Sequence, residues 1–426
     1  MAVKSIRRRF NPLSLDALNF LLADVRGALG PYLNVFLVTQ QHWSQSEVGW
    51  VTTISGLLGI AVQTPIGAGI DETHAKRGAI VLALAVLALG AVIIFAWPSF
   101  WPVIIANSLM AIVGDVFGPA VAALTLGVYA RKQLARRMGR NSACDHAGNV
   151  AIAAVAAAVG YMFSQRAVFL LVPVFALLAA LAVLSIPAAA IDYERARDLG
   201  RKTAGAASSA AGYGILFKSR PLVVFGLCVM LFHLANAALL PLVGQKLAAA
   251  YPRDATAMMS ACIVAAQAVM LPIALLVGRT ADSWGRKPLF LAGFAVLPLR
   301  AVLYTFSDNS VWLIGVQLLD GVGAGIFGAL TPLVIADIMH GSGRYNLAQG
   351  AIATVQGIGA SLSGLAAGII VDHFGYSAAF LAASGAAAAA LAVFGLWMPE
   401  TADAKAKSPR PKASTGAPQP PDLAPA

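Results

Sequence analysis

The sequence predicts an all-α membrane protein in which about twelve transmembrane helices form two pseudo-symmetric six-helix bundles. Three observations support this fold class. Hydrophobic residues make up 59% of the chain and charged residues only 12%, which is far from the balance of a soluble protein. Apolar runs of roughly 20 residues, each long enough to cross a bilayer, follow one another along the chain. One long polar stretch, 192–219, divides these runs into two sets.

Each expected helix is an apolar run that ends at a charge cluster or at a Gly, Pro, Asn or Asp turn. In the first half the runs are 15–39, 48–70, 78–97, 101–129, 141–164 and 167–191. In the second half they are 220–245, 256–279, 288–306, 310–339, 345–371 and 376–398. We therefore expect a cytoplasmic N-terminus (1–14), a first bundle (15–191), a cytoplasmic linker (192–219), a second bundle (220–398) and a disordered cytoplasmic tail (399–426).

Lys and Arg residues gather in the segments on one side of the expected membrane, among them 131–140 and 195–220. Basic residues in short loops are retained in the cytoplasm, so the pattern predicts a multi-pass inner-membrane protein with both termini cytoplasmic. The net charge of +11 is explained by this topology and not by nucleic-acid binding, because no soluble module collects the basic residues. Asp16, Asp24 and Arg26 interrupt the first apolar run, which argues against a cleaved export signal.

Enzymatic chemistry is not indicated. The three cysteines, Cys144, Cys228 and Cys262, lie in unrelated spans and suggest neither a disulfide framework nor a metal site. The chain has no complete phosphate-binding loop and no paired metal-binding motif. We therefore expect no enzyme activity, no cofactor and no metal. The expected partners are the lipid bilayer, a small-molecule substrate and a proton, and the expected oligomeric state is a monomer.

Two loops repeat one pattern. "GAGIDETHAKRGAI" (67–80) and "GRTADSWGRKPLF" (278–290) each place an acidic residue four positions after a glycine and a basic pair further on. Two more matches, "AALTL" with "GALTP" and "GRNSA" with "GRYNL", follow in the same order in both halves. Ordered matches of this kind indicate a duplicated bundle, which is a common design of transporters.

With these loops in view, the chain resembles the major facilitator superfamily of secondary transporters over residues 11–398. The second loop matches nearly all of the family's signature, which is a Gly, an Asp four positions later, and then Gly-Arg-Lys. A short loop of this kind holds two helices close while its charges contact a neighbouring helix. The expected latch comprises Gly67, Asp71, Arg77, Gly278, Asp282, Gly285, Arg286, Lys287 and Asp337. The alternative is that these charges only mark the membrane boundary.

The chain also departs from the family pattern. Ala75 stands where the first loop should have its second glycine. Met110 and Gln317 occupy the positions where many members have an arginine, although the glycines beside them are kept. The expected fifth helix has no Gly-Pro-rich motif like that of many drug/proton antiporters. The resemblance therefore implies a transporter without assigning it to a drug exporter.

Polar residues inside the spans are the remaining candidates, because each is costly in hydrocarbon unless it faces a cavity or a partner. We expect proton coupling or substrate binding from Asp24, Arg26, Asn34, Asp115, His233, Asn236, Arg300 and Asp320. Asp24 is favoured as the cavity-facing group, on a helical face shared with Gly27, Pro31 and Asn34. The alternatives are structural charge pairing for the aspartates, with Arg26 or Arg300 as the cation, and simple packing for His233.

The working hypothesis is a secondary transporter of small organic molecules that works by alternating access, is coupled to protons and exports its substrate. A second hypothesis is a proton symporter that imports an organic anion, bound by Arg26 or Arg300. A third hypothesis, of another class, is a membrane sensor derived from a transporter fold.

Overall fold

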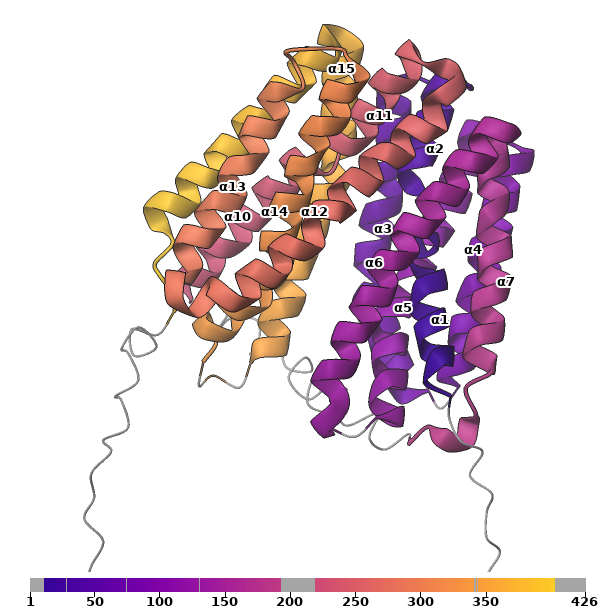
Figure 1. Ribbon diagram of the computed structural model, residues 1–426, viewed down its shortest axis with the longest axis vertical. Helices are drawn as coiled ribbons and strands as arrows, with labels where there is room; N and C mark the ends of the chain where they lie inside the picture. The colour runs from indigo at the N-terminus through magenta and orange to yellow at the C-terminus, as the bar shows by residue number, and fades with distance from the viewer. Residues whose placement is uncertain are drawn as a thin grey trace, which may run out of the picture.

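The computed structural model describes residues 11–27, 29–73, 75–129, 131–192, 219–340, 342 and 344–402. These residues form helices and loops, and no strand occurs among them. Most of the expected N-terminal segment, linker and tail lies outside this part of the chain. The described helices form two bundles, the first half on the right of Figure 1 and the second half on the left. This is the architecture of twelve transmembrane helices in two six-helix bundles that the sequence predicts.

The first half starts with a span in three pieces and continues with five further spans. The first span consists of α1 (Pro12–Leu22), the 3-10 turn η1 (Asp24–Gly27) and α2 (Gly30–Thr39). Ser44 and Glu47 start α3 with reciprocal side-chain to backbone hydrogen bonds at 3.2 and 2.9 Å, a capping box. The remaining elements are α3 (Gln45–Glu72), α4 (Lys76–Ala96), α5 (Phe100–Val128), α6 (Arg131–Met162), η2 (Arg166–Leu170), α7 (Leu171–Leu184) and η3 (Ala188–Ala190).

The second half has its own interrupted first span, made of α10 (Arg220–Asn236) and α11 (Leu239–Ala250). The remaining elements are η4 (Pro252–Asp254), α12 (Ala255–Trp284), α13 (Arg286–Leu303), α14 (Ser310–Ile338) and α15 (Tyr345–Trp397). With 53 residues, α15 is far too long for one span. Its backbone leaves the helix at Gly375, where φ is 82°, so α15 supplies two spans that meet at a sharp turn.

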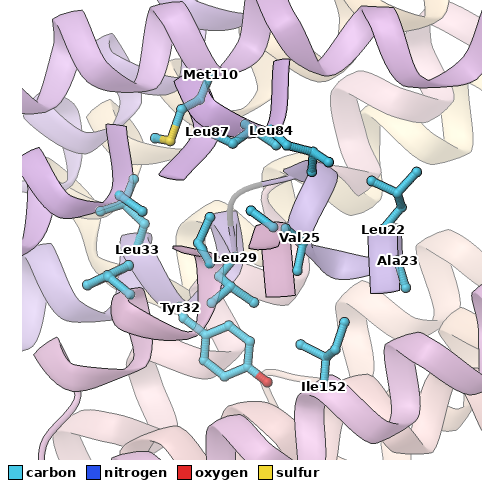
Figure 2. Packing of buried hydrophobic residues seen from close by; sticks show 14 of the residues in the cluster. Leu22, Ala23, Val25, Leu29, Tyr32, Leu33, Leu84, Leu87, Met110 and Ile152 are labelled. Atoms are coloured by element: carbon cyan, nitrogen blue, oxygen red, sulfur yellow. The ribbon is translucent and has the colours of Figure 1, made fainter. Parts of the chain in front are cut away.

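The expectation of one continuous helix over 15–39 is wrong. Ala23 leaves the helix with φ −38° and ψ −118°, and Leu29 adopts a left-handed conformation with φ 56°. Both residues are buried, and Figure 2 places Val25 and Leu29 among packed apolar side chains. A face shared by Asp24, Gly27, Pro31 and Asn34 needs an unbroken helix, so the structure removes that geometry.

Two other helix bounds differ clearly from expectation. The fifth helix begins at Arg131 instead of 141, because its first three turns are polar and extend beyond the apolar run. The sixth ends as an α-helix at Leu184, before Pro187, instead of continuing to 191. An apolar run therefore marks the membrane-crossing part of a helix but not its ends.

We define the terminal face as the face where α1 begins and α15 ends, and the opposite face as the other side of the bundles. One buried apolar core lies mainly in the first half but includes Ala248, Ala255, Met259 and Ile263 of the second half, and another lies in the second half. The halves contact each other through α3 with α15, α6 with α12, and α2 with α11. Their ribbons lie close at the opposite face and diverge toward the terminal face (Figure 1).

Candidate functional site

The strongest polar cluster inside a span surrounds Arg300 of α13. Its guanidinium is 2% exposed and pairs with Asp320 of α14 through Nη1, while Nη2 donates to Asn236 Oδ1 of α10 at 2.5 Å. Asp320 also accepts from Gln317 Nε2 at 3.0 Å, and Gln317 accepts from the Tyr304 hydroxyl. Three helices of the second half are thus tied to one buried cation.

Asp115 stands apart from this cluster. It lies fifteen residues after the start of α5, about 22 Å along the helix and near its middle. The side chain is half-buried and faces α3, because a Cβ added at Gly59 would lie 3.5 Å from its Oδ2. Among the residues that the structure describes, no cation or hydrogen-bond donor contacts its carboxylate.

A cavity of about 260 Å³ opens directly along this part of α5. It is bounded by the interrupted first span, by α3 and by α5, and its polar residues are Asn34, Thr52, Ser55 and Asn107. Asn107, Ala111 and Asp115 follow one another at intervals of four residues, so they share one face of α5. The carboxylate therefore lies one turn beyond the cavity on the face that lines it.

The first span contributes to this cavity through its backbone and through Asn34. Gly27 and Gly30, at the end of η1 and the start of α2, line it directly. Irregular backbone inside a membrane occurs where it faces protein or a water-filled cavity, which fits this location. For Asp24 and Arg26 only the backbone, in η1, is described, so their expected side-chain roles stay predictions.

His233 makes a backbone hydrogen bond and an aromatic contact in this structure, and its expected functional role stays a prediction. Its Nδ1 lies 2.9 Å from the Val229 carbonyl of its own helix, and this ring nitrogen must carry the proton to donate there. The ring contacts Phe327 edge to face, with centroids 4.9 Å apart. Asn236, expected beside it on one face, instead binds Arg300.

Hydrogen bonds across the two halves gather toward the opposite face. The Asp372 carboxylate, in α15 before the turn at Gly375, accepts from the backbone N–H groups of Gln45 and Ser46 at 2.9 and 2.8 Å. Gln45 Nε2 also donates to the Tyr376 hydroxyl at 3.0 Å. The first turn of α3 leaves its N–H groups without helical partners, so a carboxylate from the other half satisfies two of them.

Further contacts continue this closure toward the interior. Tyr32 and Ser260 share a hydrogen bond of 2.8 Å, and Thr53 Oγ1 donates to the Ser361 carbonyl at 2.6 Å. His146 Nδ1 lies 2.9 Å from Gln267 Oε1, joining α6 to α12 at greater depth. None of these partners is predicted as a pair by the sequence, because each joins residues more than a hundred positions apart.

The loop between α12 and α13 brings the expected second-half latch residues together at the terminal face. Arg286 Nη1 lies 2.7 Å from Asp282 Oδ1, and its Nε lies 3.1 Å from Asp337 Oδ2 at the end of α14. Burial opposes the charged form, but hydrogen bonds and charge attraction from Asp282 and Asp337 outweigh it and raise the pKa of Arg286. Lys287 Nζ donates to the Gly395 carbonyl at 2.8 Å, and Gly278 lies in open space on α12.

Glu400, which the sequence places in the tail, completes this loop. Its carboxylate accepts from the backbone N–H groups of Arg286 and Lys287 at 2.9 and 3.2 Å. Gly285 makes the turn with φ 90°, and a Cβ there would lie 2.5 Å from Glu400 Oε2. Burial alone would raise the pKa of Glu400, but these hydrogen bonds, with those from Ala402 and Thr401, hold it below its usual value.

The first-half copy of the loop is built differently. Arg77 Nη1 donates to the Ile186 carbonyl at 2.6 Å, and fully buried Lys76 donates to the Ile70 carbonyl at 2.6 Å. Gly67 and Asp71 lie in α3, and the Asp71 side chain is outside the described part of the structure. Near the same face, Asp16 of α1 pairs with Arg137 and Arg140 of α6 at 2.7 and 2.5 Å, an arrangement that the sequence reasoning missed.

Two helical bundles that meet face to face, with polar groups in and between their spans, are the architecture of secondary transporters, membrane proteins that are not enzymes. The chain belongs to the major facilitator superfamily, whose family model matches residues 15–275 and 227–423. It is 47% identical to an uncharacterized MFS-type transporter of Mycobacterium tuberculosis (strain ATCC 25618 / H37Rv) over 390 residues, 92% of this chain and 93% of the relative.

Solved structures of the same fold are more distant in sequence. A mutant form of the nucleoside transporter NupG superposes with a TM-score of 0.77 at 14% identity, over 91% of this chain and all of that one. A D-xylose-proton symporter superposes with a TM-score of 0.70 at 13% identity, over 92% of this chain and 98% of that one. At such low identity these likenesses concern the fold alone.

Proposed function

We propose that the protein is a proton-coupled secondary transporter of small organic molecules and that Asp115 is its proton-binding group. The observation that carries this proposal is the position of Asp115: a carboxylate within a span, on the cavity-lining face of α5, with no cation beside it in the described residues. Such a carboxyl group is neutral only when it binds a proton, so proton binding and release change the charge beside the cavity.

Asp320 is less suited to this role, although it also lies within a span. Its partner Arg300 keeps its charge at any physiological pH and is almost fully buried. Protonation of Asp320 would leave that cation without a counter-ion, which is costly in a low-dielectric interior. We assign the cluster of Arg300, Asp320 and Asn236 to holding the second half in shape beside the cavity.

The proposed mechanism is alternating access across the inner membrane, with the terminal face in the cytoplasm. The closed contacts of Asp372, Tyr32 and Thr53 at the opposite face support a state that is open toward the terminal face. The basic residues in the loops of that face support its cytoplasmic location. In this orientation the N-terminus, the linker and the tail are cytoplasmic, as the sequence predicts.

Export remains the predicted direction of transport. The organic-anion importer needs a cation that can reach a substrate. Arg300 already binds Asp320 and Asn236, so this alternative depends on Arg26, whose side chain is outside the described part of the structure. The sensor hypothesis is separated from both by flux, because a sensor binds its ligand without transporting it.

The test uses proteoliposomes that contain the full-length protein and a pH-sensitive dye. Anionic, neutral and cationic small molecules are added outside, and the internal pH is followed. A coupled transporter gives a compound-dependent pH change: symport acidifies the lumen and antiport makes it more alkaline. Asp115→Asn is expected to abolish this change while substrate exchange persists. Asp254→Asn, in the loop at the opposite face, is the matched control. Unchanged proton movement in Asp115→Asn would overturn the assignment.

A further inference from the structure

A groove of about 530 Å³ lies on the second half, between the end of α13 and the start of α14. Its wall includes Leu303 of α13 and Val311, Gly315 and Leu319 of α14, and none of its lining residues is charged. Val311 is 78% exposed, and α14 is long and apolar enough to cross a membrane. Because the two halves are joined at the opposite face, this exposed end of α14 faces the surrounding lipid and not the space between the halves.

The shape of the groove is fixed by one tryptophan and one glycine. Trp312 Nε1 donates to the Leu303 carbonyl at 2.8 Å, which holds the indole ring as part of the wall. Gly315 lies on the floor, where an added Cβ would meet nothing within 4 Å. The related helix α5 has the same length of 29 residues, and its start aligned with that of α14 places Ile105 at the position of Gly315. The glycine therefore leaves open a space that a branched side chain would occupy.

One end of the groove is polar. Asn309 Oδ1 accepts from the backbone N–H groups of Val311 and Trp312 at 2.9 and 3.2 Å, which determines the orientation of the amide. Its Nδ2 makes no hydrogen bond within the described residues, so two N–H donors are available to an outside group. Beside it Asp308, 81% exposed, pairs with Lys246 at 2.5 Å. This end therefore lies at the polar edge of the membrane.

The length of the groove matches one leaflet of a bilayer. Asn309 and Leu319 mark its two ends along α14, about 15 Å apart at 1.5 Å per residue. The hydrocarbon core of a membrane is about 30 Å thick, so the groove reaches from the polar edge to about the midplane. A molecule that fills it has a polar group at one end and an apolar chain as long as one leaflet.

We propose that this groove binds one acyl chain of a membrane phospholipid, in the leaflet at the opposite face. The chain lies along Val311, Gly315 and Leu319, which share one face of α14 because they follow at intervals of four residues. An ester or phosphate oxygen of the lipid accepts from Asn309 Nδ2. An apolar helix of a second copy of the chain would leave that amide without an acceptor. The site is separate from Asp115 and does not depend on transport.

Binding here means enrichment over ordinary lipid contact. Hydrophobic burial favours no particular site inside a bilayer, so the preference comes from close packing in the groove and from the hydrogen bond of Asn309. One such hydrogen bond corresponds to an enrichment of about two- to tenfold. Leu109 of α5 is the internal reference, because it is as far from the start of its helix as Leu319 is and follows the filled position at Ile105.

The test uses the full-length protein in phosphatidylcholine liposomes. A trace of phosphatidylcholine with a diazirine near the end of one chain is photolysed, and the labelled residues are identified by peptide mass spectrometry. Leu319 is expected to be labelled about two- to tenfold more than Leu109, although the Leu109 side chain is 46% exposed and Leu319 is less so. Equal or weaker labelling of Leu319 would mean ordinary lipid contact and would overturn the site.

Three variants complete the design. Gly315→Ile copies the first half and fills the floor, so labelling of Leu319 is expected to fall to the level of Leu109. Asn309→Asp keeps the helix cap but removes the donors, so it is expected to lower the labelling as well. Gly328→Ile, on the same helix, is the matched control, because an added Cβ there also meets nothing within 4 Å.

Unchanged labelling in Gly315→Ile or in Asn309→Asp would overturn the site. Chemical cross-linking in the same liposomes tests the other occupant. Dimers that are present in the wild type and lost in Gly315→Ile would assign the groove to a second copy of the chain and overturn the lipid assignment.

Discussion

Asp372 of the second half caps the first turn of α3 in the first half, accepting the backbone N–H of Gln45 at 2.9 Å. The two residues are 327 positions apart in the chain. A carboxylate here also meets the positive end of the α3 dipole. Because the partners belong to different halves, this contact exists only while the opposite face is closed.

Asp372→Ala is expected to shift the protein toward opening of the opposite face, because two N–H groups lose their acceptor. The population in which the opposite face is open should rise about two- to tenfold. This change corresponds to the free energy of one hydrogen bond or somewhat more. Electron-electron distance measurements between spin labels at Gln40 and Tyr251, exposed there in different halves, report this population. The labels are attached in a Cys144→Ser background, and an unchanged distance distribution would rule out a role for Asp372 in holding the opposite face closed.

The same contact predicts a pH dependence. Partial burial alone would raise the pKa of Asp372, but hydrogen bonds from Ser46 and Gln45 outweigh it and hold this pKa below the usual aspartate value. A lowered pKa means that the contact contributes fully above about pH 4 and is lost as the pH falls through the lowered value. The spin-label distances should therefore stay constant from neutral pH down to about pH 4 and lengthen only below it. Lengthening already near pH 6 would contradict this prediction.

Removing one member of the buried Arg300–Asp320 pair should lower the stability of the protein more than removing both. Arg300→Met leaves Asp320 without its cation and is expected to destabilise the protein by about 3–5 kcal/mol. Arg300→Met with Asp320→Leu removes both charges and should recover much of that loss. Thermal unfolding of the three proteins in detergent measures the difference. Equal destabilisation of the single and double variants would show that the pairing carries little of the stability.

Gly285→Ala is expected to disrupt the loop at the terminal face. Alanine is strained at φ 90°, at about 1–3 kcal/mol, and its Cβ would collide with Glu400. The loss should appear as lower thermal stability and slower transport. Gly278→Ala, where an added Cβ meets nothing within 4 Å, is the matched control. Equal effects of the two substitutions would mean that the turn at Gly285 has no special role.

The sequence predicts the elements of this fold well because apolar length is a strong signal in membranes. The repeated loop likewise predicts that Asp282 and Arg286 come together, since they are four residues apart, and the family resemblance adds Asp337 as their partner. The interruption of the first span is not predictable in this way, because it depends on a left-handed leucine, Leu29, held by tertiary packing.

Contacts between distant segments are equally hidden in the chain. Glu400 follows the last span and looks like the first acidic residue of a tail, yet it satisfies two N–H groups at the start of α13. Gln245 looks like an ordinary polar residue near a helix end, and only the assembled halves reveal that its oxygen has no partner among the described residues. The surroundings of Glu400 and Gln245 depend on which helix ends meet in the folded protein. Composition and periodicity do not predict those meetings.

Because of the interruption at Ala23–Leu29, the two parts of the first span pack against different bundles. α1 packs against α6 and α7 of its own bundle, whereas α2 packs against α11 of the other. A rigid rod fastened to both bundles would transmit every rotation of one to the other. We expect a joint near the middle of this span to let the two bundles tilt independently, with the bend at Gly27 and Gly30 in the wall of the cavity.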